Sequence, residues 1–255
     1  MLAASSDGLT ASASISYTVE RPPVPSTGSP AATTAPASLR LSVADLTVFG
    51  RRGAIGCRMA SGPINTCRVT LRARKRVIAR GARAAAAAGK RRLLVRLRLT
   101  AYGRELLKAR VGGRRAVVRA TGSASGATST AAAQTRAILA VEQFTTPAGS
   151  WIPDRAALTP TGRQFLRRLG GKLIAISAAR CDGYAAEAPK HGNGLLVSLN
   201  RARVMCRALQ RLGARVTPTP IGHGSSDPIA SNTNESGRAK NRRVKVTLHH
   251  RRQAL

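Results

Sequence analysis

The chain of 255 residues is poor in acidic side chains, with 10 Asp and Glu against 43 Lys and Arg and a formal net charge of +33. Aromatic residues make up only 3% of it, and no apolar run is long enough to cross a membrane. The excess of cations predicts attraction to polyanions. Because binders of single-stranded nucleic acid stack bases on aromatic side chains, and no DNA-binding motif is present, the composition argues against sequence-specific nucleic-acid recognition.

Histidine and cysteine are also scarce, with four of each. No Cys-x-x-Cys pair occurs and no cluster has metal-ligand spacing, so we expect neither a metal site nor a cofactor. Glu187, His191 and His223 are the side chains from which an acid–base set could be built, but nothing in the pattern fixes their geometry. No nucleophile motif is present either, so the sequence predicts a protein without catalytic residues.

The cysteines fall into two regions, Cys57 with Cys67 and Cys181 with Cys206. This even count predicts two local disulfides, although three pairings are formally possible and four buried free thiols are the alternative. Disulfides indicate an extracytoplasmic location, at the cell wall or cell surface. The first residues lack the charged segment and apolar core of a signal peptide, so we expect the export signal to lie upstream of Met1.

The first half of the chain divides by composition into three parts. Residues 1–19 alternate small or polar with apolar side chains and resemble the closing strand of an upstream immunoglobulin-like repeat. Residues 20–40, rich in Pro, Ser, Thr and Ala, predict an extended linker. Residues 41–136 contain short alternating strands and predict an all-β sandwich, similar to the immunoglobulin-like modules of actinobacterial surface proteins. Its arginines are expected to form a solvated face on a spacer domain.

Residues 138–250 change to strands that alternate with amphipathic helices, in the order β-α-β-α-β-(α)-β. We expect the first helix to follow Thr159 as its N-cap, with Pro160 in its first turn. The second helix is expected to be capped by Ser198 and to close at Gly213. The predicted fold class is therefore α+β, with the all-β sandwich followed by this mixed domain.

Two segments of the second half carry a resemblance to a known family. IGHGSSDPIASNTNESGRAKNRRVKVTL, residues 221–248, resembles the C-terminal signature of the OmpA-like peptidoglycan-binding domain, which reads G-x-G, P-I-A-x-N and then G-R-A-x-N-R-R-V. VSLNRARVM, residues 197–205, is similar to the family's L-S-x-x-R-A-x-x-V. The resemblance covers roughly residues 138–248 and implies a domain that binds peptidoglycan without catalysis.

The resemblance also implies a site for the diaminopimelate side chain of a stem peptide, which ends in an ammonium and a carboxylate. The two arginines of the family's pocket fall on Arg201, which would take the carboxylate, and Arg242. An arginine fork suits a carboxylate because two parallel N–H bonds fix its orientation. The aspartate that takes the ammonium in the family is Ala186 here, so Glu187 is the expected substitute, with Asp182 on the preceding strand as the less favoured one. Asn193 lies one place from the family's asparagine.

The motif GRAKNRRV is expected to combine a structural turn with one functional arginine. Gly237 and the residue after it should begin a short helix, Asn241 should cap the turn, and Val244 should begin the last strand. Arg242 should face the ligand together with Arg201. Arg243 is expected to be solvated or structural.

We therefore expect a non-catalytic cell-envelope protein that anchors or spaces a surface protein on peptidoglycan. The alternative is a surface adhesin or scaffold with a degenerate pocket, which binds anionic wall polymers or a protein partner through its basic surface. Salt separates the two, because attraction through bulk charge is screened at high ionic strength.

Overall fold

The computed structural model describes residues 38–50, 54–86, 89–186 and 193–251. The terminal strand predicted at 1–19 and most of the predicted linker lie outside the described residues, and so does Glu187. The first ten elements are β1 (Leu39–Ser42), β2 (Leu46–Phe49), β3 (Ala54–Met59), β4 (Thr66–Ala73), β5 (Arg76–Ala84), β6 (Leu93–Arg96), β7 (Arg98–Leu99), α1 (Ala101–Lys108), β8 (Arg114–Ala124) and β9 (Ala127–Leu139).

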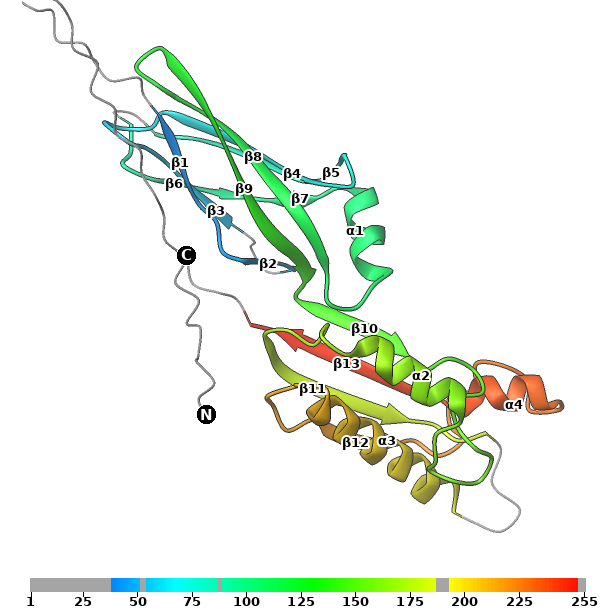
Figure 1. Ribbon diagram of the computed structural model, residues 1–255. Helices are drawn as coiled ribbons and strands as arrows, with labels where there is room; N and C mark the ends of the chain where they lie inside the picture. Colours follow the sequence, from blue (N-terminus) through cyan, green and yellow to red (C-terminus); the bar gives the residue numbers. More distant parts are fainter. Residues whose placement is uncertain (1–37, 51–53, 87–88, 187–192, 252–255) are drawn as a thin grey trace, which may run out of the picture. The chain divides into compact units, whose positions relative to one another are not determined.

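These strands form two sheets, of order β1-β3-β6 and β2-β9-β8-β4-β5-β7 (Figure 1). Strand β4 shows how the sequence builds them, because its alternate residues Cys67, Val69 and Leu71 are buried while Arg68 and Arg72 are exposed. Most buried apolar residues of both sheets belong to one hydrophobic core, whereas Leu46, Val48 and Ile138 form a small separate cluster. The assignment of this part to the immunoglobulin-like class stays a prediction.

The predicted disulfide between Cys57 and Cys67 is confirmed. It joins β3 of the three-stranded sheet to β4 of the six-stranded sheet, and both sulfurs lie in the core. The bond therefore links the two sheets directly.

The remaining elements follow in the predicted order. Strand β13 lies between β10 and β11, antiparallel to both, and β11 pairs in parallel with β12, so the sheet order is β10-β13-β11-β12 (Figure 1). The two longer helices, α2 and α3, bury their apolar side chains in a core shared with β11 and β13. The bounds are β10 (Val141–Thr145), α2 (Pro160–Leu169), β11 (Ile176–Gly183), α3 (Gly194–Arg211), β12 (Thr219–Gly222), α4 (Glu235–Asn241) and β13 (Val244–His250).

The segment from Ile138 to Phe144, where the predicted mixed domain begins, is divided between two sheets. Ile138 belongs to β9 in the six-stranded sheet, whereas Val141 begins β10 in the four-stranded sheet. The change happens at Ala140, whose N–H donates to the Phe49 carbonyl and whose own carbonyl accepts from the His250 N–H. The alternation of apolar and polar side chains along the sequence cannot show where the chain passes from one sheet to the other, because the same alternation occurs in both strands.

The helix caps agree with the sequence at three of four predicted positions. Thr159 Oγ1 accepts from the Gly162 N–H at 3.2 Å and Pro160 begins α2, both as predicted. Gly213 follows α3 with φ of +102°, a conformation that glycine adopts easily. The predicted cap at Ser198 is wrong, because α3 begins a full turn earlier at Gly194. No helix among the described residues is long and apolar enough to cross a membrane.

Replacing both Cys57 and Cys67 with alanine should lower the free energy of unfolding by about 3 kcal/mol, the loop-closure entropy for a bridge across this separation. Urea denaturation of the native chain and the double variant measures the difference. Reduction with a small thiol should shift the native midpoint and leave the variant unchanged. A native midpoint that does not move on full reduction would contradict the prediction.

Candidate ligand-binding site

The signature segments meet where α3 packs on the carboxyl ends of β11 and β12. Gly183 and Gly222 stand opposite each other in the two strands. A Cβ at Gly183 would lie 2.0 Å from the Ser198 carbonyl oxygen, and one at Gly222 would lie 2.7 Å from the Leu199 nitrogen. Ser198 Oγ also accepts from the Gly224 N–H at 2.9 Å. The glycines thus allow α3 to touch the strand backbones directly.

Arg201, predicted to take the ligand carboxylate, is almost completely buried, with 1% of its surface exposed. Its Nε donates to the Arg155 carbonyl at 3.1 Å, and its Nη2 donates to the Ile152 carbonyl at 3.0 Å. Its Nη1 donates to the Tyr184 carbonyl at 3.3 Å. Each terminal nitrogen keeps a second N–H that has no acceptor among the described residues. Two N–H groups on one guanidinium are what a bidentate carboxylate needs.

The charge of Arg201 is only partly compensated. Burial is the main reason that its pKa falls to about 10, and the positive charge of Arg242 lowers the pKa further. The carboxylate of Asp154 raises the pKa of Arg201 and so acts in the opposite direction. At neutral pH the guanidinium is still charged, yet no acid among the described residues forms an ion pair with it. The domain therefore buries a cation that lacks a close anion within the described part of the chain.

Arg242, the second predicted arginine, follows α4 and is also buried, with 6% exposed. Its Nη2 contacts the Glu235 carboxylate, and this hydrogen bond lowers the pKa of Glu235. Its Nε is buried without a partner among the described residues. The charge of Arg242 lowers the pKa of Arg201, so the two predicted cations repel each other. Their contact with a ligand stays a prediction.

Arg243 is structural rather than solvated, which decides between the two expected roles. Its guanidinium lies 3.9 Å from the centre of the Tyr184 ring, a cation–π contact. Its Nη2 donates to the carbonyl of Asp227 at 2.8 Å and to the carboxylate of the same residue at 3.0 Å. The second arginine of the motif therefore ties the loop after β12 to the residue that follows β11.

A polar cluster surrounds Tyr184, and the sequence did not predict it. The ring of His223 stacks on Tyr184 with centroids 4.8 Å apart and an angle of 11° between the planes. His223 Nε2 lies 2.9 Å from the buried carboxylate of Asp182, whose other oxygen accepts from Arg180 Nε at 2.9 Å. The only sequence signal was an aromatic residue beside each of two glycine motifs, and that signal does not show that the rings meet.

The predicted ammonium-binding side chains are only partly described. Ala186, at the position of the family's aspartate, is buried, and the structure describes nothing from 187 to 192. Asn193 Oδ1 accepts from the Leu195 N–H at 2.9 Å, so Asn193 is the N-cap of α3. This structural role replaces the predicted cap at Ser198, and a role for Asn193 in ligand binding stays a prediction.

The predicted disulfide between Cys181 and Cys206 is wrong, because both are free thiols in the structure. Cys181 lies on β11 and Cys206 on α3, and both belong to the core between helix and sheet. The pKa of Cys181 is raised, first by a hydrogen bond with the Cys206 thiol and then by burial. The two side chains thus pack as small apolar groups with a weak thiol–thiol contact.

Helix α4 begins earlier than the sequence predicted. Asn234 is its N-cap and accepts from the Gly237 N–H at 2.8 Å, so Gly237 lies inside the helix and not at its start. A Cβ at Gly237 would lie 1.8 Å from the Ser231 carbonyl oxygen, which explains the glycine of the motif. Val244 begins β13, as predicted.

Asn241, the last residue of α4, holds the loop that carries P-I-A-x-N. It is completely buried, and its Oδ1 accepts from the Ile229 N–H at 2.9 Å and the Ala230 N–H at 3.1 Å. Its Nδ2 donates to the Ala230 carbonyl at 2.7 Å and to Asn232 Oδ1 at 2.8 Å. Every polar atom of this side chain is therefore satisfied. The P-I-A-x-N segment and the asparagine of G-R-A-x-N-R-R-V therefore form one hydrogen-bonded unit.

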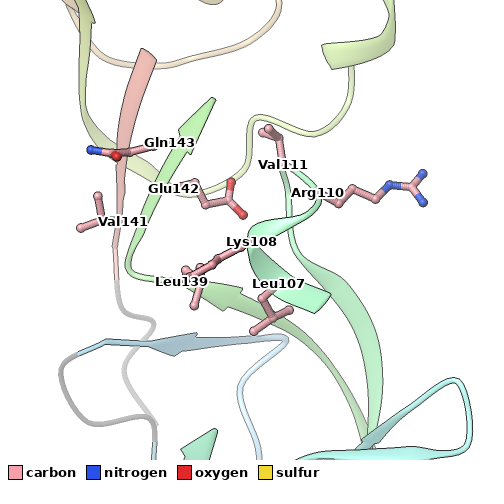
Figure 2. Close-up of a pocket in the computed structure, with 8 residues that line it drawn as sticks. All are labelled: Leu107, Lys108, Arg110, Val111, Leu139, Val141, Glu142 and Gln143. Carbon is pink, nitrogen blue, oxygen red and sulfur yellow. The ribbon is translucent and has the colours of Figure 1, made fainter. Parts of the chain in front are cut away.

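A cavity of about 500 Å³ lies elsewhere in the structure and is lined by none of the predicted ligand-binding residues. Glu142 lies among the residues that line it (Figure 2) and accepts from the Gly112 N–H at 3.0 Å. No group of His, Cys, Asp and Glu among the described residues could hold a metal ion. The cavity is lined by Leu107, Lys108, Arg110, Val111, Leu139, Val141, Glu142 and Gln143.

Comparison with known proteins connects this geometry to a family. No family model matches the chain. Over 119 residues it is 32% identical to the putative lipoprotein YfiB of Escherichia coli, an alignment that takes in 41% of this chain and 74% of YfiB. The chain belongs to the OmpA-like family. We refer to the part formed by β10 to β13 as its OmpA-like domain.

The peptidoglycan-binding protein ArfA of Mycobacterium tuberculosis is 36% identical over 99 residues, which are 38% of this chain and 30% of ArfA. The chain thus spans about a third of the length of ArfA. Among solved structures, a putative MotB-like protein of Desulfovibrio vulgaris has 24% identity and a TM-score of 0.37 over 44% of this chain and 77% of its own. The peptidoglycan-associated lipoprotein of Burkholderia pseudomallei has 19% identity and a TM-score of 0.36, over 41% and 89%. TM-scores this low add no support to the assignment, which rests on the sequence identity with YfiB.

Substitution of Asn241 by alanine should destabilise the OmpA-like domain by about 2–4 kcal/mol, because it removes the hydrogen-bond partners of two partly buried N–H groups and one partly buried carbonyl. Denaturant unfolding measures the loss. Lys240→Ala, at the exposed neighbouring position of the same helix, is the matched control and should cost under about 0.5 kcal/mol. Equal effects of the two substitutions would disprove the role given to Asn241.

Proposed function

We propose that the OmpA-like domain binds peptidoglycan, without catalysis, by taking the carboxylate of a diaminopimelate stem peptide at Arg201. The buried guanidinium of Arg201, charged and without an ion-pair partner among the described residues, is the observation that carries the proposal. ArfA, which is named a peptidoglycan-binding protein, supports it through similarity over 99 residues. Such a ligand assigns the chain to the cell envelope, where it anchors or spaces a surface protein.

A carboxylate is the ligand group that this guanidinium lacks. Burial makes the charged form of Arg201 costly, and Arg242 adds repulsion from a second cation. A carboxylate placed against the two unused N–H groups would offset both effects, because a charge-assisted bidentate pair is stronger in a buried site than in water. The site therefore favours an anion with two coplanar oxygens over a neutral group.

A segment before α2 holds Arg201 in place through its backbone. The carbonyls of Ile152 and Arg155 accept two of the three hydrogen bonds of the guanidinium. Asp154 lies between them in sequence, has φ of +52° and is close enough for its charge to raise the pKa of Arg201. Residues 152–155 thus hold the guanidinium through other N–H groups than the two that the ligand carboxylate would use. They also bring a carboxylate to the edge of the site.

The ammonium of diaminopimelate needs an acidic partner, because Ala186 has none to offer. Glu187 follows Ala186 directly in the sequence and is the first candidate. Asp154 is a second candidate that only the structure brings forward, because the Ile152 and Arg155 carbonyls on either side of it accept from Arg201 and its charge raises the pKa of Arg201. Both are side chains of the domain itself, so the two candidates are separated by single substitutions.

Arg201→Ala should weaken binding of a diaminopimelate stem peptide to the full chain by about 2–5 kcal/mol, the range for breaking a desolvated charge pair. Arg242→Ala should cost less, because Glu235 already holds part of that guanidinium. Isothermal titration measures both. Arg203→Ala, an exposed position on the same helix, is the matched control and should leave affinity unchanged.

Loss of the fold is excluded as a cause by Arg201→Lys, which keeps the charge but not the fork and should bind more weakly while unfolding normally. The alternative function, adhesion through bulk charge, predicts the opposite pattern. In that case Arg201→Ala leaves wall binding unchanged and high salt removes it. That result would show the pocket to be vestigial.

Ala186→Asp should strengthen binding of the same stem peptide, because it restores the acidic partner of the ammonium. A gain of about 1–3 kcal/mol is expected for a charge-assisted contact. Glu187→Gln and Asp154→Asn, tested separately, should identify which carboxylate serves the native chain by the larger loss of affinity. If none of the three substitutions changes affinity, the ammonium is not recognised at this end of the pocket.

A further inference from the structure

The outer face of the six-stranded sheet is lined by arginines. Alternate residues of β4 are buried in the core, and Arg68 and Arg72 between them are exposed on the opposite side. The register places Thr70 of β4 opposite both Arg80 of β5 and Arg119 of β8. Outward-facing residues of neighbouring strands therefore stand side by side.

The arginines form a regular array rather than a single cluster. Arg80 stands directly opposite Arg98 of β7, and Arg115 and Arg119 lie four residues apart on β8. Because strands are about 4.8 Å apart and residues on one face repeat about every 7 Å, the guanidinium groups are distributed over a broad surface. The exposed arginines of this face are Arg68, Arg72, Arg80, Arg98, Arg115 and Arg119.

No acidic side chain stands among them. None of the strands β2, β9, β8, β4, β5 and β7 contains Asp or Glu. The ion pairs found among the described residues involve none of these arginines. Like charges at opposite strand positions destabilise a sheet, so a polyanion that covered this face would relieve their repulsion.

The face also lacks the aromatic side chains on which nucleic-acid bases stack. Phe49 is the only aromatic residue in the six strands, and it is buried in the core. Binders of single-stranded nucleic acid combine cations with aromatic platforms. Arginine forks alone suit phosphate groups, which they bind through two N–H groups. The surface thus fits a chain of phosphates that carries no bases.

We propose that this sheet face binds a linear phosphodiester-linked polymer of the cell wall, of the poly(glycerol phosphate) type. Several arginines would each neutralise a phosphate along the polymer and release its counterions. The surface exists independently of the Arg201 pocket. The choice of a wall polymer over other polyphosphates rests on the proposed function, which assigns the chain to the cell envelope.

The test titrates the full chain with purified poly(glycerol phosphate) and compares it with the variant R68Q/R72Q/R80Q/R119Q. We expect the variant to lose at least about tenfold in affinity at low salt, and the slope of log Kd against log salt to fall by roughly 3. The control R167Q/R168Q/R207Q/R211Q removes the same number of charges from exposed positions on α2 and α3. It should lose about twofold or less, since only distant charge is removed.

Equal losses in the sheet variant and the control would overturn the proposal, because bulk charge would then explain binding. Duplex DNA that binds more tightly than the polymer, and is lost in the sheet variant, would assign the face to nucleic acid instead. The pocket is tested separately, since stem-peptide affinity should be the same in the native chain and the sheet variant. A native chain that binds the polymer but no stem peptide would refute the proposed function and retain the sheet surface.

Discussion

The direct contact of α3 with the ends of β11 and β12 determines the position of every other group in the site. Gly183 and Gly222 leave no side chain between helix and sheet, and the Ser198 carbonyl occupies the place where a Cβ would otherwise be. Arg201 lies less than one turn further along the same helix. A side chain at either glycine would push α3 outward. The Arg201 guanidinium would then lie too far from the Tyr184 carbonyl for the hydrogen bond that it donates there.

Burial of an arginine has a large desolvation cost for a domain of this size. Replacement of buried charges by apolar side chains is often neutral or stabilising, so a fold gains little stability from one. Arg201 is retained with hydrogen bonds to backbone carbonyls alone, and its lowered pKa records the cost of burial. Sites that sacrifice stability in this way are typical of ligand recognition. The contacts of Arg243 with Tyr184 and Asp227 show the contrasting case, in which side chains of the domain itself hold a buried arginine, although its Nη1 has no hydrogen-bond partner among the described residues.

The arginines that give the chain its large positive charge therefore fall into two groups. A few arginines are buried, and each of these has specific hydrogen-bond partners, N–H groups without an acceptor among the described residues, or both. Many more are exposed on strands that contain no acid at all, and no ion pair within the described residues involves them. The first group is suited to selecting one small anion by geometry. The second is suited to holding a long anion by the number of its charges, at any point along its length.

Much of the OmpA-like domain was determined by its sequence alone. The order of strands and helices, the cap at Thr159 and the start of β13 at Val244 all followed from local patterns or from the family signature. These features depend on residues near one another in the chain, or on spacings that the family preserves. The prediction for the Cys57–Cys67 bond succeeded for the same reason, because a short loop limits where its ends can lie.

The tertiary structure decided what side chains from distant segments do when they meet. It turned Asn193 into a helix cap, left Cys181 and Cys206 as thiols, and stacked His223 on Tyr184. It also brought residues 152–155 over Arg201 and placed the arginines of separate strands on one face. The contacts between distant side chains among these outcomes have no local signal, because alternation and capping motifs describe a segment by itself. Contacts between segments depend on packing and register, and these are settled only when the whole chain has folded.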